Sequence, residues 1–208
     1  LSEENLQMAI KKVKQNKGAP GIDKMSVQEV EQWFEQYQEE IISKIMNKQY
    51  RPMPVKRVYI PKPNGKQRAL GIPTVVDRVI QQAMSQVLNK IYEPIFSEHS
   101  FGYRPRNAQM AMEEVLQYLN EGYEWIVDLD IEKFFDTVNQ DKLISILREN
   151  VNDATTLHLI RAYLRAGVLD DGLIKSTTVG TSQGGPISVI LSNIYLDKFD
   201  KELESRNL

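Results

Sequence analysis

The sequence predicts an α+β fold in which short antiparallel strands mix with long amphipathic helices. Three observations support this fold class. Asn64-Gly65 lies between two β-type segments and is a strong signal for a tight hairpin turn. Apolar residues recur at helical spacing over about 74–92 and 187–205. Residues 125–131 alternate in the period-two pattern of a strand, which favours short strands among helices over a doubly wound sheet.

Composition limits the class of protein. A chain of 208 residues can form one large domain or two small lobes, and its 41% hydrophobic content is typical of a globular protein. No apolar run is long enough to span a bilayer, so no membrane partner is expected. Without cysteine there are no disulfides or thiolate zinc sites, which fits a cytoplasmic location. Two histidines, His99 and His158, argue against a histidine-rich metal site.

Charge is unevenly distributed along the chain. The formal net charge is −2, yet residues 44–78 carry nine Lys and Arg against one acid, Asp77. This local excess of +8 leaves −10 for the remainder of the chain. The imbalance predicts a face that meets a polyanion, and a solvated charged surface is the alternative.

The first 50 residues predict two helices joined by a loop. Ser2 is the expected N-cap of a helix over 2–16, and glycines and a proline interrupt 16–23. Ser26 is expected to cap the second helix, with Glu29 completing a capping box. The apolar side of that helix consists of Trp33, Phe34, Tyr37 and Ile41.

A basic hairpin and a long helix follow. Segments 55–60 and 66–72 flank the Asn64-Gly65 turn, and the loop and second arm carry Lys62, Lys66 and Arg68. A helix is expected over about 74–92, with its apolar stripe in the core.

The remaining elements follow in order. A turn at 101–105 leads into a helix over 107–120, and the strand at 125–131 comes next. Helices are expected near 140–150 and 153–166, followed by a hairpin at Asp171-Gly172 and a glycine-rich bend at 181–186. The last helix covers about 187–205, and its expected buried residues are Val189, Ile190, Ile194, Leu196 and Phe199.

The strand at 125–131 carries the main functional signal. One face is apolar, and the other bears Asp128 and Asp130 near the strand end. Carboxylates on an otherwise buried strand need a compensating partner, and a divalent cation is an effective one. The pattern therefore suggests a metal-dependent phosphoryl-transfer site.

Six motifs in order resemble the fingers and palm of reverse transcriptases encoded by bacterial group II introns, the intron maturases. They are the Gly18–Asp23 loop, Ile60–Pro73, Asp77–Gln81, Phe101–Pro105, Val127–Asp136 and Gly180–Ser188. The resemblance implies an N-terminal extension of helices and a loop (1–50), fingers with the basic hairpin (51–122) and a partial palm (123–208). It also implies an RNA-directed DNA polymerase that uses dNTP, an RNA template and a DNA primer.

The resemblance assigns two Mg²⁺ ions to the palm. Asp130 matches the first catalytic aspartate, and the carbonyl of Ile131 matches a second group that faces a metal. Carboxylates suit this chemistry because they hold cations against the primer 3′-oxygen and the leaving pyrophosphate. Asp128 is either structural or supports the metal site indirectly, and Asp136 is expected to cap or orient the next turn.

Other matched positions concern the nucleotide. Phe135 matches the aromatic that blocks a ribose 2′-hydroxyl, with Phe134 as the core residue of the pair. Arg68 matches the arginine that contacts the triphosphate, with Lys62 or Lys66 as its companion. Gln183 and Gly184 match the motif bordering the nascent base pair.

RNA contacts are expected at exposed basic residues of the extension and fingers. The assigned residues are Lys17, Lys56, Arg57, Arg78 and Arg104. For Arg104 a purely structural turn is an open alternative.

The largest departure from the family pattern is an absence. The second catalytic motif, Tyr-Ala-Asp-Asp or a relative of it, does not occur in the sequence. One carboxylate cannot complete an octahedral site, so the chain is expected to be an inactive fragment by itself. Apolar surface left uncovered would favour a homodimer. Two alternatives stay open: an RNA-binding splicing module without polymerisation, and a retron or other bacterial reverse transcriptase.

Overall fold

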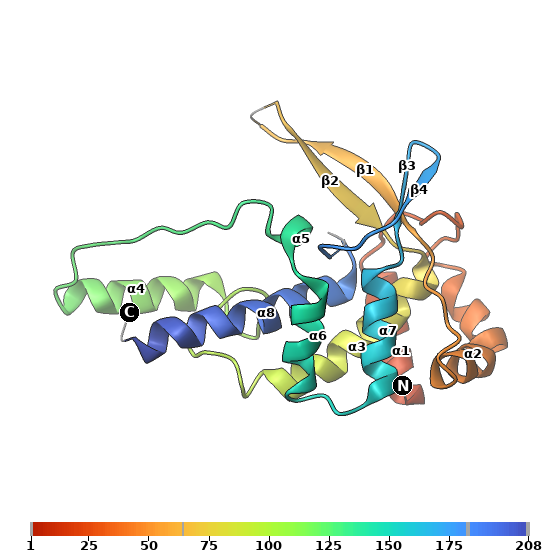
Figure 1. Cartoon of the computed structure of the whole chain (residues 1–208), viewed down its shortest axis with the longest axis horizontal. Coiled ribbons are helices and arrows are strands. Elements are labelled where there is room, and N and C mark those ends of the chain that lie inside the picture. The colour runs from red at the N-terminus through yellow and green to blue at the C-terminus, as the bar shows by residue number, and fades with distance from the viewer. Residues whose placement is uncertain (1, 64, 182–183, 207–208) are drawn as a thin grey trace.

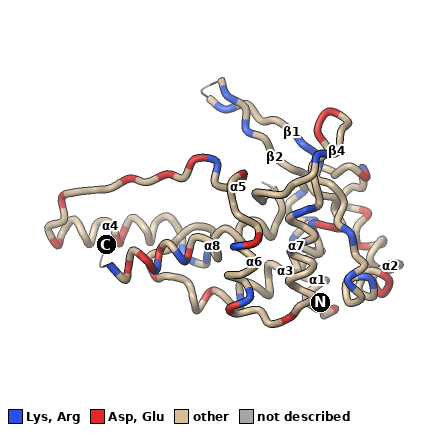
Figure 2. The backbone as a smooth tube through the Cα atoms, viewed as in Figure 1, with Lys and Arg blue, Asp and Glu red and all other residues tan. Residues whose placement is uncertain are grey.

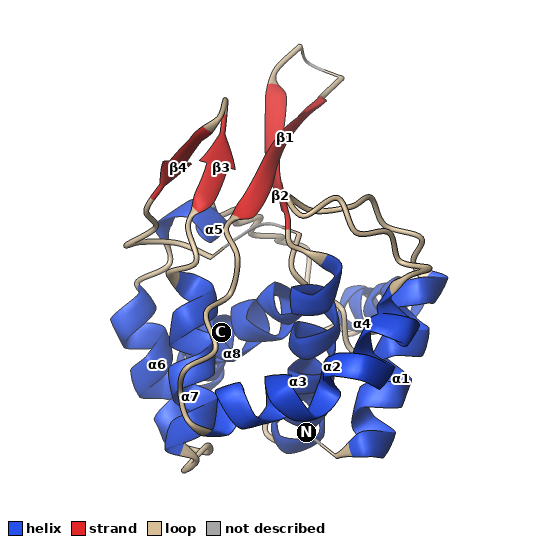
Figure 3. Cartoon of the chain, turned by 90° about the vertical axis from the view of Figure 1, so that its right-hand side faces the viewer, coloured by secondary structure: helices blue, strands red, loops and turns tan. Residues whose placement is uncertain are grey.

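A computed structural model describes residues 2–63, 65–181 and 184–206. Figure 1 shows long helices packed side by side with a small sheet above one end of them. In the perpendicular view the strands lie together on one side of the helices (Figure 3). The predicted α+β class is confirmed.

The central element is α3 (Val75–Tyr92), which packs against α1 (Glu3–Gln15) and α8 (Pro186–Ser205). Val75, Val79, Ile80 and Ala83 are 0% exposed, because the apolar stripe of α3 faces helices on two sides. The Asn5 amide of α1 donates to the Ala83 carbonyl (2.9 Å). Burial on both sides makes α3 the element that joins α1 to α8.

The N-terminal helices follow the prediction with one correction. The Ser2 hydroxyl caps α1 by accepting from the Asn5 N–H. Helix α2 (Val30–Met46) starts later than the sequence predicts, and Ser26 is not its N-cap. The Ser26 hydroxyl and N–H both donate to the Glu29 carboxylate, at 2.6 and 2.8 Å. The pair therefore closes a turn ahead of the helix, since the serine oxygen acts as a donor there and caps no helix N–H.

Four strands form one sheet in the order β2-β1-β3-β4. Strand β1 (Val55–Pro61) pairs antiparallel with β2 (Gln67–Ile72), and β3 (Val168–Asp170) pairs antiparallel with β4 (Leu173–Lys175). Both predicted hairpins are confirmed. They are joined by a parallel pairing of β1 with β3, which sequence alone did not predict because the two strands are far apart in the chain.

The predicted strand at 125–131 is wrong. This segment is extended but has no strand partner within the described residues, and both of its faces are open. Trp125 is 94% exposed, Val127 81% and Leu129 68%. Alternation reports the propensity to pair, whereas a strand also needs a neighbour for its backbone N–H and C=O groups. Figure 1 shows the segment as a long arm between α4 (Ala108–Asn120) and α5 (Phe134–Thr137).

The C-terminal helices are predicted closely. Helices α6 (Gln140–Arg148), α7 (Ala154–Leu164) and α8 match the expected ranges within three residues at either end. The burial of α8 differs from the prediction at three places, because Phe199 is 46% exposed and Val189 and Leu196 are only half-buried. The buried stripe of α8 runs through Ile187, Ile190, Leu191 and Ile194, and position 199 falls outside that stripe.

A single hydrophobic cluster includes residues from all three predicted parts of the chain. Leu6 lies in the N-terminal extension, Ile80 in the fingers, and Leu143 and Ile190 in the partial palm. The boundaries near 50 and 122 therefore cross a continuous core and stay a prediction. Within the described residues, no helix combines the length and apolar character needed to cross a membrane.

Candidate functional site

The basic hairpin projects away from the helices as an arm. Figure 2 shows its Lys and Arg residues gathered along β1, β2 and the tip. Lys62, Lys66 and Arg68 are exposed, and the Lys62 N–H donates to the Lys66 carbonyl (2.7 Å) to close the turn. Arg68 pairs with Ile60 in the ladder. The exposed cations therefore lie on a projecting hairpin whose base is fixed by the sheet.

A cavity of about 470 Å³ lies beneath β2. It is bordered by the end of α1, by α3, by the 101–105 turn and by the start of α8. Three predicted nucleotide-binding residues meet there: Arg68 from β2, Phe135 from α5 and Gly184 from the bend before α8. Arg78 of α3, predicted to bind RNA, also lines the cavity. Gln183, predicted beside them, lies outside the described residues. Segments more than a hundred residues apart therefore form one concave site.

Gly184 allows the two walls of this cavity to meet. Its φ is +124°, and a Cβ there would lie 2.4 Å from the Gly71 carbonyl oxygen of β2. A side chain would push the bend away from the hairpin, so only glycine suits this contact. Gly185 follows as the N-cap of α8, and Pro186 occupies its first turn.

Phe135 is positioned by the segment that precedes α8. Its carbonyl accepts from the Thr181 N–H (2.7 Å), and the Val138 carbonyl accepts from the Gly180 N–H (2.8 Å). Buried Gln140 donates to the carbonyls of Gly180 and Leu164, which fixes the same bend from below. These bonds hold α5 beside the cavity.

The two phenylalanines of α5 lie in different surroundings. The Phe134 ring packs against the hydrophobic core and lies edge-on to Tyr195, with ring centres 6.0 Å apart. The Phe135 ring, edge-on to Phe134, lines the cavity. Phe134 therefore anchors α5, and Phe135 is free to meet a ligand.

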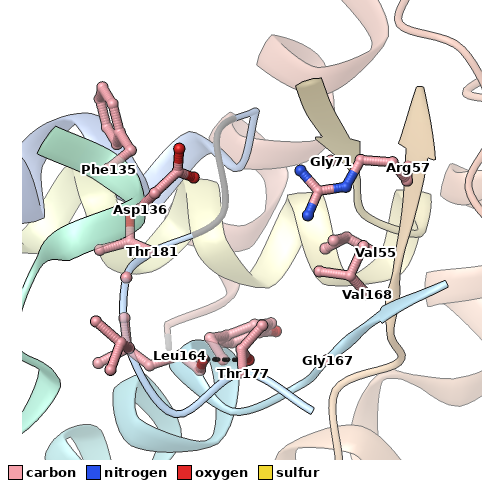
Figure 4. A pocket seen from close by; sticks show the side chains of 13 residues that line it. Val55, Arg57, Gly71, Phe135, Asp136, Leu164, Gly167, Val168, Thr177 and Thr181 are labelled. Atoms are coloured by element: carbon pink, nitrogen blue, oxygen red, sulfur yellow. Dashed lines mark hydrogen bonds between the residues drawn. The ribbon is translucent and has the colours of Figure 1, made fainter. Parts of the chain in front are cut away.

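A second cavity, of about 120 Å³, lies between α5 and the base of the hairpin. Figure 4 shows Asp136 and Arg57 on opposite sides of it, with Val55 and Val168 below Arg57. The following helix α6 is capped by Asn139 and not by Asp136, so the expectation that Asp136 caps the next turn is wrong. The position of Asp136 at the cavity follows from the turn of α5, which places it next to Phe135.

Asp130 and Ile131 do not lie at the cavity beneath β2. Both are exposed on the arm before α5, as is Asp128, and neither lines the cavity that holds Arg68. Figure 2 shows this arm carrying a series of acidic residues. Because residues 125–131 pair with no strand in the described part of the chain, no backbone hydrogen bonds hold this segment against the sheet.

A metal requires more ligands than the described residues supply. Asp130 offers a carboxylate and Ile131 a carbonyl, which are the oxygen donors that a hard divalent cation prefers. The described residues contain no group of three acidic, histidine or cysteine side chains able to hold one ion. The donor type fits a divalent metal, but the number of donors among the described residues does not.

Two of the predicted RNA-binding arginines are internal. The Arg78 guanidinium donates to the Ala19 carbonyl (2.7 Å), and burial lowers its pKa while nearby Asp23 opposes that change. The Arg104 side chain is 3% exposed and pairs with Glu93 at 2.9 Å. For Arg104 the structural alternative is favoured, because its charge is already paired. Lys17 and Lys56 are exposed, and Arg57 is half-buried.

A buried polar cluster around Asp77 was not assigned a role from the sequence. Its carboxylate accepts from the Tyr50 hydroxyl (2.7 Å), the Thr74 hydroxyl (2.7 Å) and the Met53 N–H (3.1 Å). Burial raises the pKa of Asp77, and these hydrogen bonds oppose the rise. Burial and the nearby Asp77 raise the pKa of Tyr50, so its hydroxyl stays a donor.

This cluster fixes the chain entering β1 to the start of α3. The signal for it was present, because Thr74-x-x-Asp77 is a capping-box sequence directly after Pro73. Sequence could show the local cap but not the two long-range donors, Tyr50 and Met53.

Comparisons with known proteins identify the family. Residues 60–208 match the family described as "Reverse transcriptase (RNA-dependent DNA polymerase)". The chain belongs to the reverse transcriptase family. The resemblance to this family on six motifs is therefore confirmed.

Two curated relatives are similar to this chain over more than three quarters of its length. Protein YkfC of Escherichia coli is 39% identical over 79% of this chain and 44% of its own length. The group II intron-encoded protein LtrA of Lactococcus lactis is 39% identical over 77% of this chain and 27% of its own. The chain thus spans less than half the length of either relative.

A solved structure shows the same fold. A chain of the partial Cas6-RT-Cas1–Cas2 complex superposes with a TM-score of 0.61 at 22% identity, covering 98% of this reverse transcriptase chain and 34% of that one. This likeness supports the fold alone.

Proposed function

We propose that this chain belongs to an RNA-directed DNA polymerase of a group II intron that also binds the intron RNA to assist splicing. The cavity that gathers Arg68, Phe135 and Gly184 carries the proposal. A cation, an aromatic ring and a closely approaching glycine backbone are the groups that a nucleotide site needs for phosphate, sugar and base. The relation to an intron-encoded protein supplies the biological context.

The proposed roles follow from these positions. Arg68 contacts the triphosphate, with Lys62 or Lys66 as a second cation on the hairpin arm. Phe135 lies under the sugar and excludes a 2′-hydroxyl by its bulk, and Gly184 lets the backbone approach the base pair. Gln183 is proposed to border the same pair.

Asp130 is the proposed catalytic ligand of magnesium, together with the Ile131 carbonyl. When bound, the metal would neutralise charge on the reacting phosphates. The described residues lack the further ligands, so we expect this chain alone to give no primer extension. Detectable extension by the isolated chain would contradict that expectation.

The polymerase proposal is tested on the full-length protein. Primer extension on an RNA template should be lost in Asp130→Asn and retained in Asp171→Asn, a matched exposed aspartate in the β3–β4 turn. Full extension by Asp130→Asn would refute the catalytic assignment. Phe135→Val should raise ribonucleotide incorporation relative to deoxynucleotides, and unchanged sugar discrimination would refute the role of the ring.

An RNA-binding role in splicing is the second candidate function. It is favoured by the exposed cations of the hairpin arm and by a relative named nuclear intron maturase 4, mitochondrial, of Arabidopsis thaliana, at 32% identity over 64% of this chain. Binding to structured RNA should weaken steeply with salt. Lys62→Gln with Lys66→Gln should reduce that salt slope, whereas Lys11→Gln with Lys12→Gln on α1 should leave it unchanged.

A further inference from the structure

Tyr103 has an unusual backbone conformation for an exposed aromatic residue. Its φ is +54°, and the residue is 85% exposed. Bulky residues rarely adopt the left-handed region, and they persist there only where the surrounding structure holds them. Such residues are found preferentially at ligand sites, and Tyr103 lies at the edge of the 470 Å³ cavity.

The turn around Tyr103 is held from both sides. On its C-terminal side, the Arg104 guanidinium donates to the carbonyls of Ser97 (2.5 Å) and Ser100 (2.8 Å). On its N-terminal side, the Asn193 amide of α8 donates to the Gly102 carbonyl (2.9 Å). The Tyr103 side chain itself makes no hydrogen bond or ring contact with any described residue. The turn is therefore held in place, and it presents an exposed ring at the edge of the cavity.

The cavity next to this ring has the character of a nucleic-acid site. Its lining includes Arg68 and Arg78 but no aspartate or glutamate among the described residues. Phe135 supplies a second aromatic ring in the same lining. Cationic groups beside exposed rings bind single-stranded nucleic acids, because cations attract the backbone and rings stack on the bases.

We infer that Tyr103 is a stacking platform for a nucleobase at this cavity. The inference rests on the proposed function and deepens it by assigning a base-contacting residue. An unpaired base of the RNA strand and the base of a free nucleotide share this chemistry. Stacking requires only the ring face, so Phe should replace Tyr at this position.

The test compares base-bearing and abasic ligands on the chain as it stands. A labelled ten-nucleotide RNA and an abasic oligomer of equal length and charge are titrated by fluorescence anisotropy. Tyr103→Ala should weaken binding of the base-bearing RNA roughly five- to hundred-fold and leave the abasic oligomer unaffected. Tyr103→Phe should bind as the wild type does. Tyr123→Ala, which removes an aromatic ring of 65% exposure beyond α4, serves as the matched control.

A parallel titration with a fluorescent deoxynucleoside triphosphate separates the two sources of the base. Loss for RNA alone assigns the platform to the RNA strand, and loss for the nucleotide alone assigns it to the incoming base. Equal loss for base-bearing and abasic oligomers, or no loss for any ligand, overturns the inference. A wild-type chain that binds neither RNA nor nucleotide overturns the proposed function as well, so the two failures are distinguishable.

Tyr103→Gly separates binding from folding. Glycine adopts φ +54° without strain, so this variant should unfold at the wild-type temperature or above while losing base-dependent binding. If Tyr103→Gly keeps the wild-type preference for base-bearing RNA, the ring has no role in stacking.

Discussion

Two aspartates show how differently the chain treats its acidic residues. Asp77 is 1% exposed and accepts three hydrogen bonds, two of which join α3 to the chain entering β1. Asp130 is exposed on an arm without strand partners in the described part of the chain. All of the donors that Asp77 needs lie in this chain, whereas the Asp130 side chain makes no hydrogen bond or ion pair with the described residues. Asp77 thus stabilises the fold, whereas Asp130 is the aspartate proposed to bind the metal.

Hydrogen exchange should show the largest difference between the two regions. Amides in α3 near Ile80 are expected to exchange at least about a thousand-fold more slowly than those of 125–131, since only the former require global unfolding. Mass spectrometry of exchanged peptides would measure this. Comparable protection of both regions would mean that the arm pairs with a strand in solution.

Asp77→Ala should cause the next largest effect. The substitution leaves the Tyr50 hydroxyl and the Met53 N–H buried without their acceptor, so the free energy of unfolding should fall by about 2–4 kcal/mol. Asp130→Ala should change it by less than about 0.5 kcal/mol, because the side chain is exposed. Urea denaturation monitors both. Equal losses in the two variants would break the comparison.

The pH dependence of stability should sharpen the role of Asp77. Its pKa is raised by burial, so the folded protein holds this proton to a higher pH than the unfolded chain, whose value is about 3.9. The stability from this proton is complete below that unfolded value and is lost as the pH rises through the folded pKa. The free energy of unfolding should therefore decline by at most about 1.4 kcal/mol per pH unit over this window.

Asp77→Asn should remove that decline, because an amide has no proton to lose. Denaturation curves collected between pH 4 and pH 7 would show it. A wild-type slope that survives in the Asn variant would assign the pH dependence to other groups.

Trp125→Ser should have the smallest effect on folding. Because Trp125 is 94% exposed, the free energy of unfolding should stay within about 0.5 kcal/mol of the wild type. Self-association through the exposed apolar residues of 125–131 should weaken, as measured by sedimentation velocity. Met8→Ser, at 52% exposure on α1, should leave association unchanged. A wild-type chain that stays monomeric at high concentration would contradict the expected homodimer.

Local signals predicted most of the fold. Asn64-Gly65 and Asp171-Gly172 predicted both hairpins, because tight turns with these residues depend on only a few neighbours. Helical periodicity predicted α3 and α8 within two residues at each end. The prediction failed at 125–131 for a different reason: the pattern was typical of a strand, but no strand in the described part of the chain pairs with this segment.

The candidate site was predictable in its parts and not in its assembly. The motifs indicated Arg68, Phe135 and Gly184 individually, and the structure brings them to one cavity. The sequence did not indicate a role for Tyr103, because an exposed aromatic residue in a turn belongs to no helical or strand periodicity. Its left-handed backbone conformation and its position at the cavity are visible only in three dimensions.

By itself the sequence determined the elements, the family resemblance and the residues that bear chemistry, because turns, caps and periodicity act over a few residues. The tertiary structure decided which of those residues meet. It joined two hairpins through a parallel pairing, buried Arg104 in an ion pair and left Asp130 on an open arm. The physical reason is that burial and pairing depend on neighbours far along the chain, and no local pattern contains that information.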